Sequence, residues 1–391
     1  MKWKNKLHEF DGIAEIYKLN GVITKDIYIF GAGAIGKSFF NIVNRFCKLK
    51  AFIDNDKEKQ SNIYCGIPVI SLEEYLYKVD TKNAFIVLCL KKEYSKTVKN
   101  QLLMNGIKEN TMFMERSEYE KCLRIMLFYN RNFIYLPIAQ ISLTERCTLR
   151  CEKCAHACNY VSNQREDMTL KVAKSSADYF FKYVDFVEEF VLIGGEPLLY
   201  RYLEEIADYI GSKYRNKIGI FSITTNGTLM PQESLLSVCR KYDMLFRVSN
   251  YEESVHWLKP KLEKLKVVLR EQGVPYSLVG GGWTDYGFGY VDRGKKNEAL
   301  EKVFDKCWTP CHEVRGDKFY FCVMARSVAE NMERNVGTED YFDLSIDSDD
   351  NRKAFFEYTM GYSEKGYLDM CNYCHGADRI NYPIPSAMQM K

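Results

Sequence analysis

The stretch CTLRCEKCAHAC, residues 147–158, places four cysteines within twelve residues. It follows the mostly apolar run IAQISLT, residues 138–144, which is typical of a buried β-strand. The first three cysteines, Cys147, Cys151 and Cys154, have the spacing C-x3-C-x2-C. A loop directly after a parallel strand lies at the end of a sheet where ligands usually bind. Three thiolates can hold three irons of a cubane cluster and leave the fourth iron open to a ligand.

Strands and helices alternate after this loop. Four more strands are predicted, each separated from the next by a helix-like segment; they are EEFVLIGGEP (188–197), KIGIFSITTNG (217–227), MLFRVSNY (244–251) and PYSLVGG (275–281). Strands separated by helices of this length imply a parallel sheet covered by helices, and five or six such units curve towards a partial or full barrel. We therefore expect an α/β fold, with a partial (β/α)6 barrel over residues 136–295.

Three motifs in this region resemble those of the radical S-adenosylmethionine (SAM) enzymes. They are the CxxxCxxC loop, the GGEP sequence that ends the second strand, and the TTNG sequence that ends the third. The resemblance implies that Cys147, Cys151 and Cys154 bind a 4Fe-4S cluster. The residues that it implies for SAM binding are Gly194, Gly195, Glu196, Thr224, Asn226 and Ser249. Independently of any family, a carboxylate at the end of a parallel sheet suits a cationic ammonium, and paired glycines allow close approach of the backbone.

The chemistry follows from the same resemblance. The open iron would chelate the amino and carboxylate groups of SAM, and one electron would cleave SAM to methionine and a 5′-deoxyadenosyl radical that abstracts hydrogen from a C–H bond. An electron donor such as flavodoxin or ferredoxin is implied. Oxidation, epimerisation, dehydration and cross-linking all remain open as outcomes, and the sequence identifies no catalytic acid or hydrogen donor.

Cys158 gives a rival interpretation. With Cys147, Cys151 and Cys154 it could saturate a ferredoxin-like cluster or a zinc ion, as in a non-catalytic electron-transfer or metal-sensing protein. GGEP and TTNG argue against a closed site, which would need neither motif. We therefore treat Cys158 as a neighbour of the site.

A second group of cysteines predicts another metal centre in a cysteine-rich extension, residues 296–380. Its members are Cys307, Cys311, Cys322, Cys371 and Cys374. Gly316-Asp317 is typical of a hairpin turn, which would deliver Cys322. The extension is similar to the SPASM or twitch tails of radical SAM enzymes, which implies one auxiliary 4Fe-4S cluster with one cysteine to spare. A zinc site that uses four of the five is the alternative.

The N-terminal region contains a glycine loop, Gly31-Ala-Gly33-Ala-Ile-Gly36, between a predicted strand and a helix, with Asp54 after the next strand. This is the spacing of a dinucleotide-binding fingerprint. We expect a small Rossmann-like parallel-sheet domain over residues 25–115. It resembles the N-terminal domains of bacterial sugar acyltransferases and other glycan-tailoring enzymes, so it could bind a nucleotide or nucleotide sugar, or serve in docking.

Composition limits the partners. The 391-residue chain has 55 Lys and Arg against 52 Asp and Glu and no concentrated basic run, which argues against a nucleic-acid or membrane partner. The start, MKWKNKLHEFDG, has no apolar stretch after its charges, so we expect a cytoplasmic protein. The remaining five of the 14 cysteines are expected to be packing residues. The glycine loop favours a saccharide or nucleotide-linked substrate, whereas the cysteine-rich extension favours a peptide.

Overall fold

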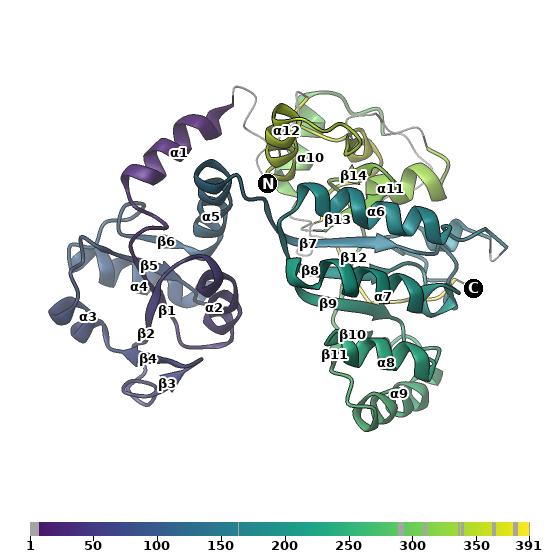
Figure 1. Cartoon of the computed structure of the whole chain (residues 1–391), viewed down its shortest axis with the longest axis horizontal. Helices are drawn as coiled ribbons and strands as arrows, with labels where there is room; N and C mark the ends of the chain where they lie inside the picture. The colour runs from purple at the N-terminus through teal and green to yellow at the C-terminus, as the bar shows by residue number, and fades with distance from the viewer. Residues whose placement is uncertain are drawn as a thin grey trace. The chain divides into compact units, whose positions relative to one another are not determined.

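A computed structural model gives the fold of the chain. It describes residues 8–162, 164–287, 293–307, 311–334, 337, 340–361, 365–377 and 382–390. The chain divides into two compact units, His8–Phe133 and a second that includes the chain from Ile134 onward (Figure 1). Within the described residues, no helix combines the length and the apolar composition that crossing a bilayer requires.

The unit His8–Phe133 is built on a six-stranded sheet in the order β3-β4-β2-β1-β5-β6. Its strands are β1 (Asp26–Phe30), β2 (Leu49–Ile53), β3 (Ile63–Tyr64), β4 (Ile67–Ile70), β5 (Ala84–Leu88) and β6 (Phe113–Glu115). Neighbouring strands pair in parallel except β3 with β4. The helices are α1 (Glu9–Leu19), α2 (Ala34–Phe46), α3 (Leu72–Lys78), α4 (Lys92–Met104) and α5 (Arg116–Arg131). The predicted βαβ start is therefore present as β1, α2 and β2.

The central strands of this sheet explain why the segment folds as it does. All five residues of β5 are buried, as are the last four of β1, which fits the continuous apolar runs expected of parallel strands. Helix α3 begins after Ser71, whose hydroxyl accepts a hydrogen bond from the Glu74 amide at 2.9 Å. This hydrogen bond satisfies an amide of the first turn that would otherwise have no partner within the helix.

The second unit contains an eight-stranded sheet in the order β11-β10-β9-β8-β7-β13-β14-β15. The first part of the unit supplies β7 (Tyr135–Ser142), β8 (Phe186–Ile193), β9 (Ile218–Thr225), β10 (Met244–Ser249) and β11 (Tyr276–Val279). These five strands pair in parallel, as predicted. The α/β fold class with a parallel sheet is thus confirmed.

The sixth parallel strand comes from the cysteine-rich part of the chain. Strand β13 (His312–Arg315) pairs in parallel with β7, and β14 (Lys318–Tyr320) turns back against it through Gly316, where φ is +61°. The hairpin predicted from Gly316-Asp317 is therefore confirmed. Strand β15 (Tyr341–Asp343) then pairs with β14. The sheet thus combines strands from both parts of the unit.

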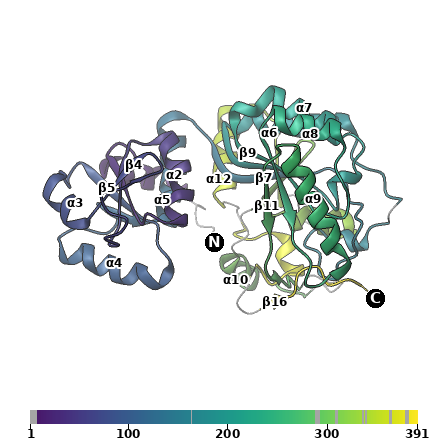
Figure 2. The same ribbon diagram turned by 90° about the horizontal axis from the view of Figure 1, so that it is seen from below.

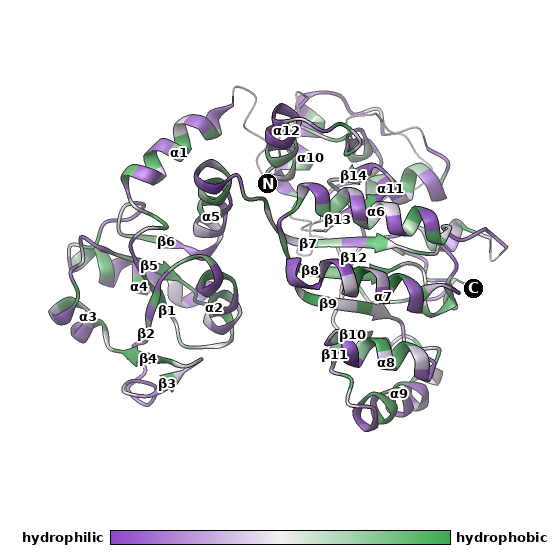
Figure 3. Cartoon of the chain, viewed as in Figure 1, coloured by the Kyte–Doolittle hydropathy of each residue, from purple (hydrophilic) through white to green (hydrophobic). Residues whose placement is uncertain are grey.

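Helices cover one side of this sheet. They are α6 (Leu170–Tyr183), α7 (Leu203–Tyr214), α8 (Glu233–Lys241) and α9 (Lys259–Glu271). Figures 1 and 2 together place α6, α7 and α8 on one side and α10 (Glu298–Lys306) with β16 (Pro383–Ile384) on the other. Helices α8 and α9 mix hydrophobic and hydrophilic residues, as expected for helices with one face on a sheet (Figure 3). The remaining elements are η1 (Cys158–Tyr160), η2 (Pro197–Leu199), η3 (Arg215–Lys217), η4 (His256–Leu258), β12 (Trp283–Thr284), α11 (Val323–Asn331), α12 (Asp349–Thr359) and η6 (Asp369–Tyr373).

Candidate functional site

A cavity of about 320 Å³ lies at the carboxyl ends of β8, β9 and β10, beside the loop that follows β7. Its lining brings together most of the residues predicted from the sequence for the cluster and SAM; these are Cys147, Cys151, Cys154, Gly194, Gly195, Thr224, Asn226 and Ser249. Tyr251 and Trp283 also line it, and their rings make an edge-to-face contact with centroids 5.6 Å apart. These two aromatic residues were not predicted as site residues, because nothing in the sequence distinguishes them except their positions near strand ends.

Each of the three loop thiols lies close to a hydrogen-bond donor. The Cys147 sulfur accepts from the backbone amide of Leu149 and from Asn226 Nδ2, both at 3.5 Å. The Cys151 sulfur accepts from Gln389 Nε2 at 3.3 Å. A hydrogen bond from Cys158 lowers the pKa of Cys154, whereas burial raises the pKa of Cys147 to about 12. Because metal ligation requires thiolates, cluster binding here has to displace protons.

The paired glycines of GGEP approach the chain's own backbone closely, and both also line the cavity. A Cβ atom on Gly194 would lie 2.4 Å from the Thr144 carbonyl oxygen, and one on Gly195 would lie 2.3 Å from that of Arg146. The close approach is therefore to the chain's own backbone. The amides of Gly195 and Glu196 donate to these same two carbonyls at 2.8 and 2.9 Å. Glycine at both positions thus allows the end of β8 to pack on the start of the cysteine loop.

Glu196 is fully buried and is not among the residues that line the cavity. Its carboxylate accepts hydrogen bonds from the Asn226 amide and the Thr225 hydroxyl, both at 2.8 Å, and from the Leu198 amide at 3.1 Å. Burial raises its pKa to about 7, although these three donors oppose the change. In this structure Glu196 ties the loop after β8 to the loop after β9, and a direct contact with an ammonium stays a prediction.

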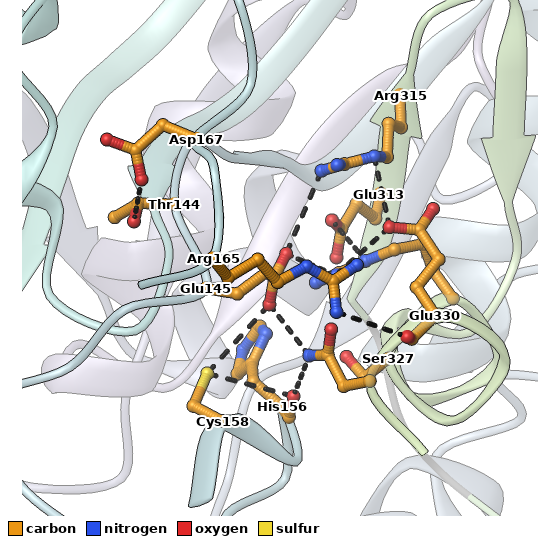
Figure 4. A network of polar contacts seen from close by, with 12 residues as sticks. Thr144, Glu145, His156, Cys158, Arg165, Asp167, Glu313, Arg315, Ser327 and Glu330 are labelled. Carbon is orange, nitrogen blue, oxygen red and sulfur yellow. Dashed lines mark hydrogen bonds and ion pairs between the residues drawn. The ribbon is translucent and has the colours of Figure 1, made fainter. Parts of the chain in front are cut away.

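Cys158 and the loop backbone join a buried polar network (Figure 4). Arg326 of α11 is fully buried, contacts the Glu145 carboxylate, and lies 2.9 Å from the Glu313 carboxylate. Asn331 Nδ2 donates to Glu145 at 2.7 Å and to the His156 carbonyl at 2.8 Å. Burial would raise the pKa of Glu145, but Arg326 and Asn331 hold it below its usual value. The network links the cysteine loop to the cysteine-rich extension, and the sequence did not predict it.

The Cys158 side chain contacts this network as well as the Cys154 sulfur. Its sulfur lies 3.9 Å from the Glu145 carboxylate and 3.7 Å from the His156 carbonyl, and it is absent from the lining of the 320 Å³ cavity. The Nδ1 atom of His156, in contrast, is buried without a hydrogen-bond partner among the described residues, while the ring lines the cavity.

Four of the five cysteines of the second group surround one apolar cavity between α10, α11 and η6. They are Cys307, Cys322, Cys371 and Cys374. Cys311 is not among the residues that line this cavity; it lies near Arg247, Glu189 and Glu313 instead. In the described part of the chain, no three His, Cys, Asp or Glu residues form a group suited to a single metal ion. Zinc needs its thiolates about 2.3 Å from one point, whereas in a cubane each cysteine binds a different iron.

The glycine loop of the unit His8–Phe133 is stabilised by its own surroundings. Gly31 has φ +117°, and a Cβ there would lie 2.6 Å from the Cys89 carbonyl oxygen. A Cβ on Gly36 would lie 2.0 Å from the Gly31 carbonyl oxygen, whereas Gly33 faces open space. Asp54 accepts a hydrogen bond from the Ala32 amide at 2.8 Å. The Asp54 carboxylate is thus paired with a loop amide of the chain itself.

Several solved structures are similar to the chain. One is anSMEcpe with bound AdoMet, at 22% identity and TM-score 0.31, over 37% of this chain and 43% of that chain. Another is BtrN in complex with AdoMet and 2-DOIA, at 16% identity and TM-score 0.40, over 64% of this chain and 98% of that one. A third is RSP, a Rex-family repressor, at 15% identity and TM-score 0.22, over 31% and 67%. The aligned part spans less than half of the anSMEcpe chain.

No sequence among the curated proteins matches the chain. A family model does: residues 141–251 match that of the radical SAM superfamily. The matched segment begins in β7 and ends at Tyr251, so it contains the cysteine loop, GGEP, TTNG and most of the cavity lining. By this match, residues 141–251 belong to the radical SAM superfamily.

Proposed function

We propose that the chain is a radical SAM enzyme, with a 4Fe-4S cluster on Cys147, Cys151 and Cys154 and SAM in the adjoining cavity. The observation that carries the proposal is that these three thiols line the same cavity as Gly194, Gly195, Thr224, Asn226 and Ser249. The soft sulfur donor set suits iron–sulfur ligation. When bound, the cluster and SAM would supply a 5′-deoxyadenosyl radical that abstracts hydrogen from an unactivated C–H bond.

Residues of the chain itself would hold the cysteine loop, shield the cavity from water and orient the substrate. Asn226 holds the cysteine loop, because its Nδ2 donates to Thr148 Oγ1 at 3.0 Å as well as to the Cys147 sulfur. Tyr251 and Trp283 give the cavity an aromatic wall that excludes water. Lys153 forms an ion pair with Asp285 at 3.1 Å, and Lys153 also lines the cavity. These two charges lie where a polar substrate could be oriented.

An open coordination position is favoured over the closed, non-catalytic alternative. Cys158 is hydrogen-bonded to the Cys154 sulfur but also contacts the Glu145 carboxylate and the His156 carbonyl, so it would have to give up these two contacts to become a fourth ligand of the same cluster. The buried, unpartnered Nδ1 of His156 and the cavity beside the three thiols are both consistent with a ligand that the loop does not itself provide.

For the second centre we propose an auxiliary 4Fe-4S cluster on Cys307, Cys322, Cys371 and Cys374. These four side chains face one cavity, and Cys311 is the spare. With Cys311 excluded, the donor set is complete without any residue of the cysteine loop. A closed set of four thiolates suits an electron-transfer or structural role for this cluster.

For the substrate we propose a saccharide or nucleotide-linked molecule, recruited through the unit His8–Phe133. The support is the loop Gly31 to Gly36 at the start of α2, with Gly33 facing open space. A peptide substrate is the alternative if isolated His8–Phe133 binds neither nucleotides nor nucleotide sugars in calorimetric titration. Flavodoxin or ferredoxin is the proposed electron donor, and the cytoplasm the proposed location.

The decisive experiment is anaerobic reconstitution with iron and sulfide, followed by reduction with dithionite and addition of SAM. We expect about 8 iron atoms per chain and release of 5′-deoxyadenosine. Replacing Cys147, Cys151 and Cys154 together by Ala should remove about half of the iron and all SAM cleavage. The matched control is Cys65→Ala, in β3–β4 of the other unit, which should change neither. Iron without 5′-deoxyadenosine would establish the non-catalytic alternative.

A further inference from the structure

A short segment near residue 390 is bound along the cysteine loop. We call Ala387–Met390 the strap. Its Met388 carbonyl accepts a hydrogen bond from the Glu152 amide, and its Met390 amide donates to the Arg150 carbonyl, both at 2.8 Å. Cys151 and Gln389 thereby face each other as an antiparallel β-bridge. Figure 1 marks this end of the chain (C) on the side of the sheet towards which β7 points.

The side chain of Gln389 is fixed by the loop and the strap. Its Oε1 atom accepts from the Arg150 amide at 2.9 Å, which settles the orientation of the amide group. Its Nε2 atom therefore carries both N–H groups. One donates to the Ala387 carbonyl at 2.7 Å and the other to the Cys151 sulfur at 3.3 Å. All the hydrogen-bonding groups of this amide are thus engaged, with one N–H directed at a predicted cluster ligand.

We propose that Gln389 is a positioning residue for the loop cluster: it holds Cys151 in place and, through its N–H group, raises the reduction potential of the cluster. This inference rests on the function proposed above. Gln389 lies 235 positions after Cys154, the last cysteine of the CxxxCxxC motif.

The physical reason is electrostatic. Reduction adds negative charge to a cluster and its thiolates, and a donor hydrogen bond to a ligating sulfur stabilises that charge. Cys151 is buried, with 7% of its surface exposed, so water competes little with the Gln389 amide. Removing the N–H group should therefore make the cluster harder to reduce.

Two variants of the full chain remove the N–H group that faces the sulfur. Gln389→Met also loses the acceptor for the Arg150 amide, whereas Gln389→Glu keeps an acceptor oxygen but adds negative charge beside Cys151. We expect Gln389→Met to lower the equilibrium constant for reduction of the loop cluster about tenfold, which is about 59 mV for a one-electron couple, and Gln389→Glu to lower it further. The measurement is a redox titration followed by electron paramagnetic resonance, with the loop cluster recognised as the signal that SAM perturbs.

The control is Met388→Leu, which keeps the strap's backbone hydrogen bond to Glu152 and should leave the potential unchanged. A wild-type potential in Gln389→Glu and Gln389→Met, with full iron, would overturn the inference. If both Gln389 variants lose the loop cluster while Met388→Leu keeps it, the claim that Gln389 raises the reduction potential is wrong. The role of Gln389 would then be to retain the cluster. Wild-type protein without a loop cluster would instead refute the proposed function.

Discussion

Replacing Arg326 by Met should destabilise the second unit strongly. Arg326 has no exposed side-chain surface, and it contacts both Glu145 and Glu313. The side chain of Glu313 is also fully buried, and that of Glu145 is 3% exposed. The variant would leave these two carboxylates without their shared cation in a site that water cannot enter.

The expected magnitude follows from that burial. Removing one partner of a buried ion pair costs about 3–5 kcal/mol, because the remaining charge has lost both water and its partner. With an m-value of about 3 kcal/mol/M in urea, the midpoint should fall by about 1–1.7 M. Asn331 and Arg315 still contact Glu145, at 2.7 and 3.7 Å, which favours the lower end of the range.

The loss should also depend on pH. Burial raises the pKa of Glu313, and Arg326 opposes that rise in the wild-type protein. Without Arg326 the pKa of Glu313 should rise further. A carboxyl group whose folded pKa is raised contributes stability below its unfolded pKa and loses it as the pH rises through the folded value. The gap between wild type and Arg326→Met should therefore be wider at about pH 8 than at about pH 5.

Urea unfolding of the metal-free protein, followed by tryptophan fluorescence, measures the stability loss at each pH. All four tryptophans, Trp3, Trp257, Trp283 and Trp308, lie outside residues 8–133, so the signal does not come from the other unit. Lys213→Met is the control, because it breaks an exposed ion pair with Asp178 and should cost less than about 1 kcal/mol. An Arg326→Met midpoint equal to that of the control, at both pH values, would refute the argument from burial.

Three further predictions follow from the sites. Cys374→Ala should lose about half of the expected total of about 8 iron atoms, whereas Cys311→Ala should keep all of them. Iron analysis after anaerobic reconstitution measures both losses. Equal losses in the two variants would show that Cys311 is a ligand. Because burial raises the pKa of Glu196 to about 7, the wild-type protein should lose stability between about pH 4.5 and 7. Glu196→Gln should remove the contribution of Glu196 to this pH-dependent loss of stability. If the free energy of unfolding from urea titrations changes with pH equally in both proteins across this range, the prediction is wrong. Gly36→Ala should destabilise the unit His8–Phe133 by several kcal/mol, because its Cβ would lie 2.0 Å from the Gly31 carbonyl oxygen, whereas Gly33→Ala should cost less than about 0.5 kcal/mol. Thermal unfolding followed by circular dichroism measures the difference between the two variants. Similar melting curves for both would show that the loop rearranges to accept the new side chain.

The parallel strands and the cysteine loop could be predicted because their signals are local. The apolar runs that became β7 to β11 each carry their own pattern, and the three loop cysteines sit within eight residues of one another. The resemblance to the radical SAM enzymes implied a role for Thr224 and Ser249 at the same site, and both line the cavity with the loop cysteines.

The contacts that support the site could not be predicted, because they join distant segments. Arg326 reads as an ordinary polar residue of a helix until its two carboxylates are known, and Gln389 lies in a segment without periodicity. The close approach of Gly194 and Gly195 to the backbone of Thr144 and Arg146 was also hidden, because it joins loops that lie far apart in the sequence. Which four of the five later cysteines share a cavity could likewise be read only from the structure, where Cys311 does not line it.

Strand β13 has a consequence for how the second unit can be divided. It pairs with β7 through His312 and Glu313, although the predicted barrel region ends at residue 295. A fragment that stopped at residue 295 would leave that edge of β7 without its neighbour, and an unpaired apolar edge is a template for aggregation. On the function proposed above, a cluster bound at Cys307 and Cys322, on either side of β13, would hold this strand against β7. Loading the proposed second cluster would thereby stabilise the sheet that carries the cysteine loop.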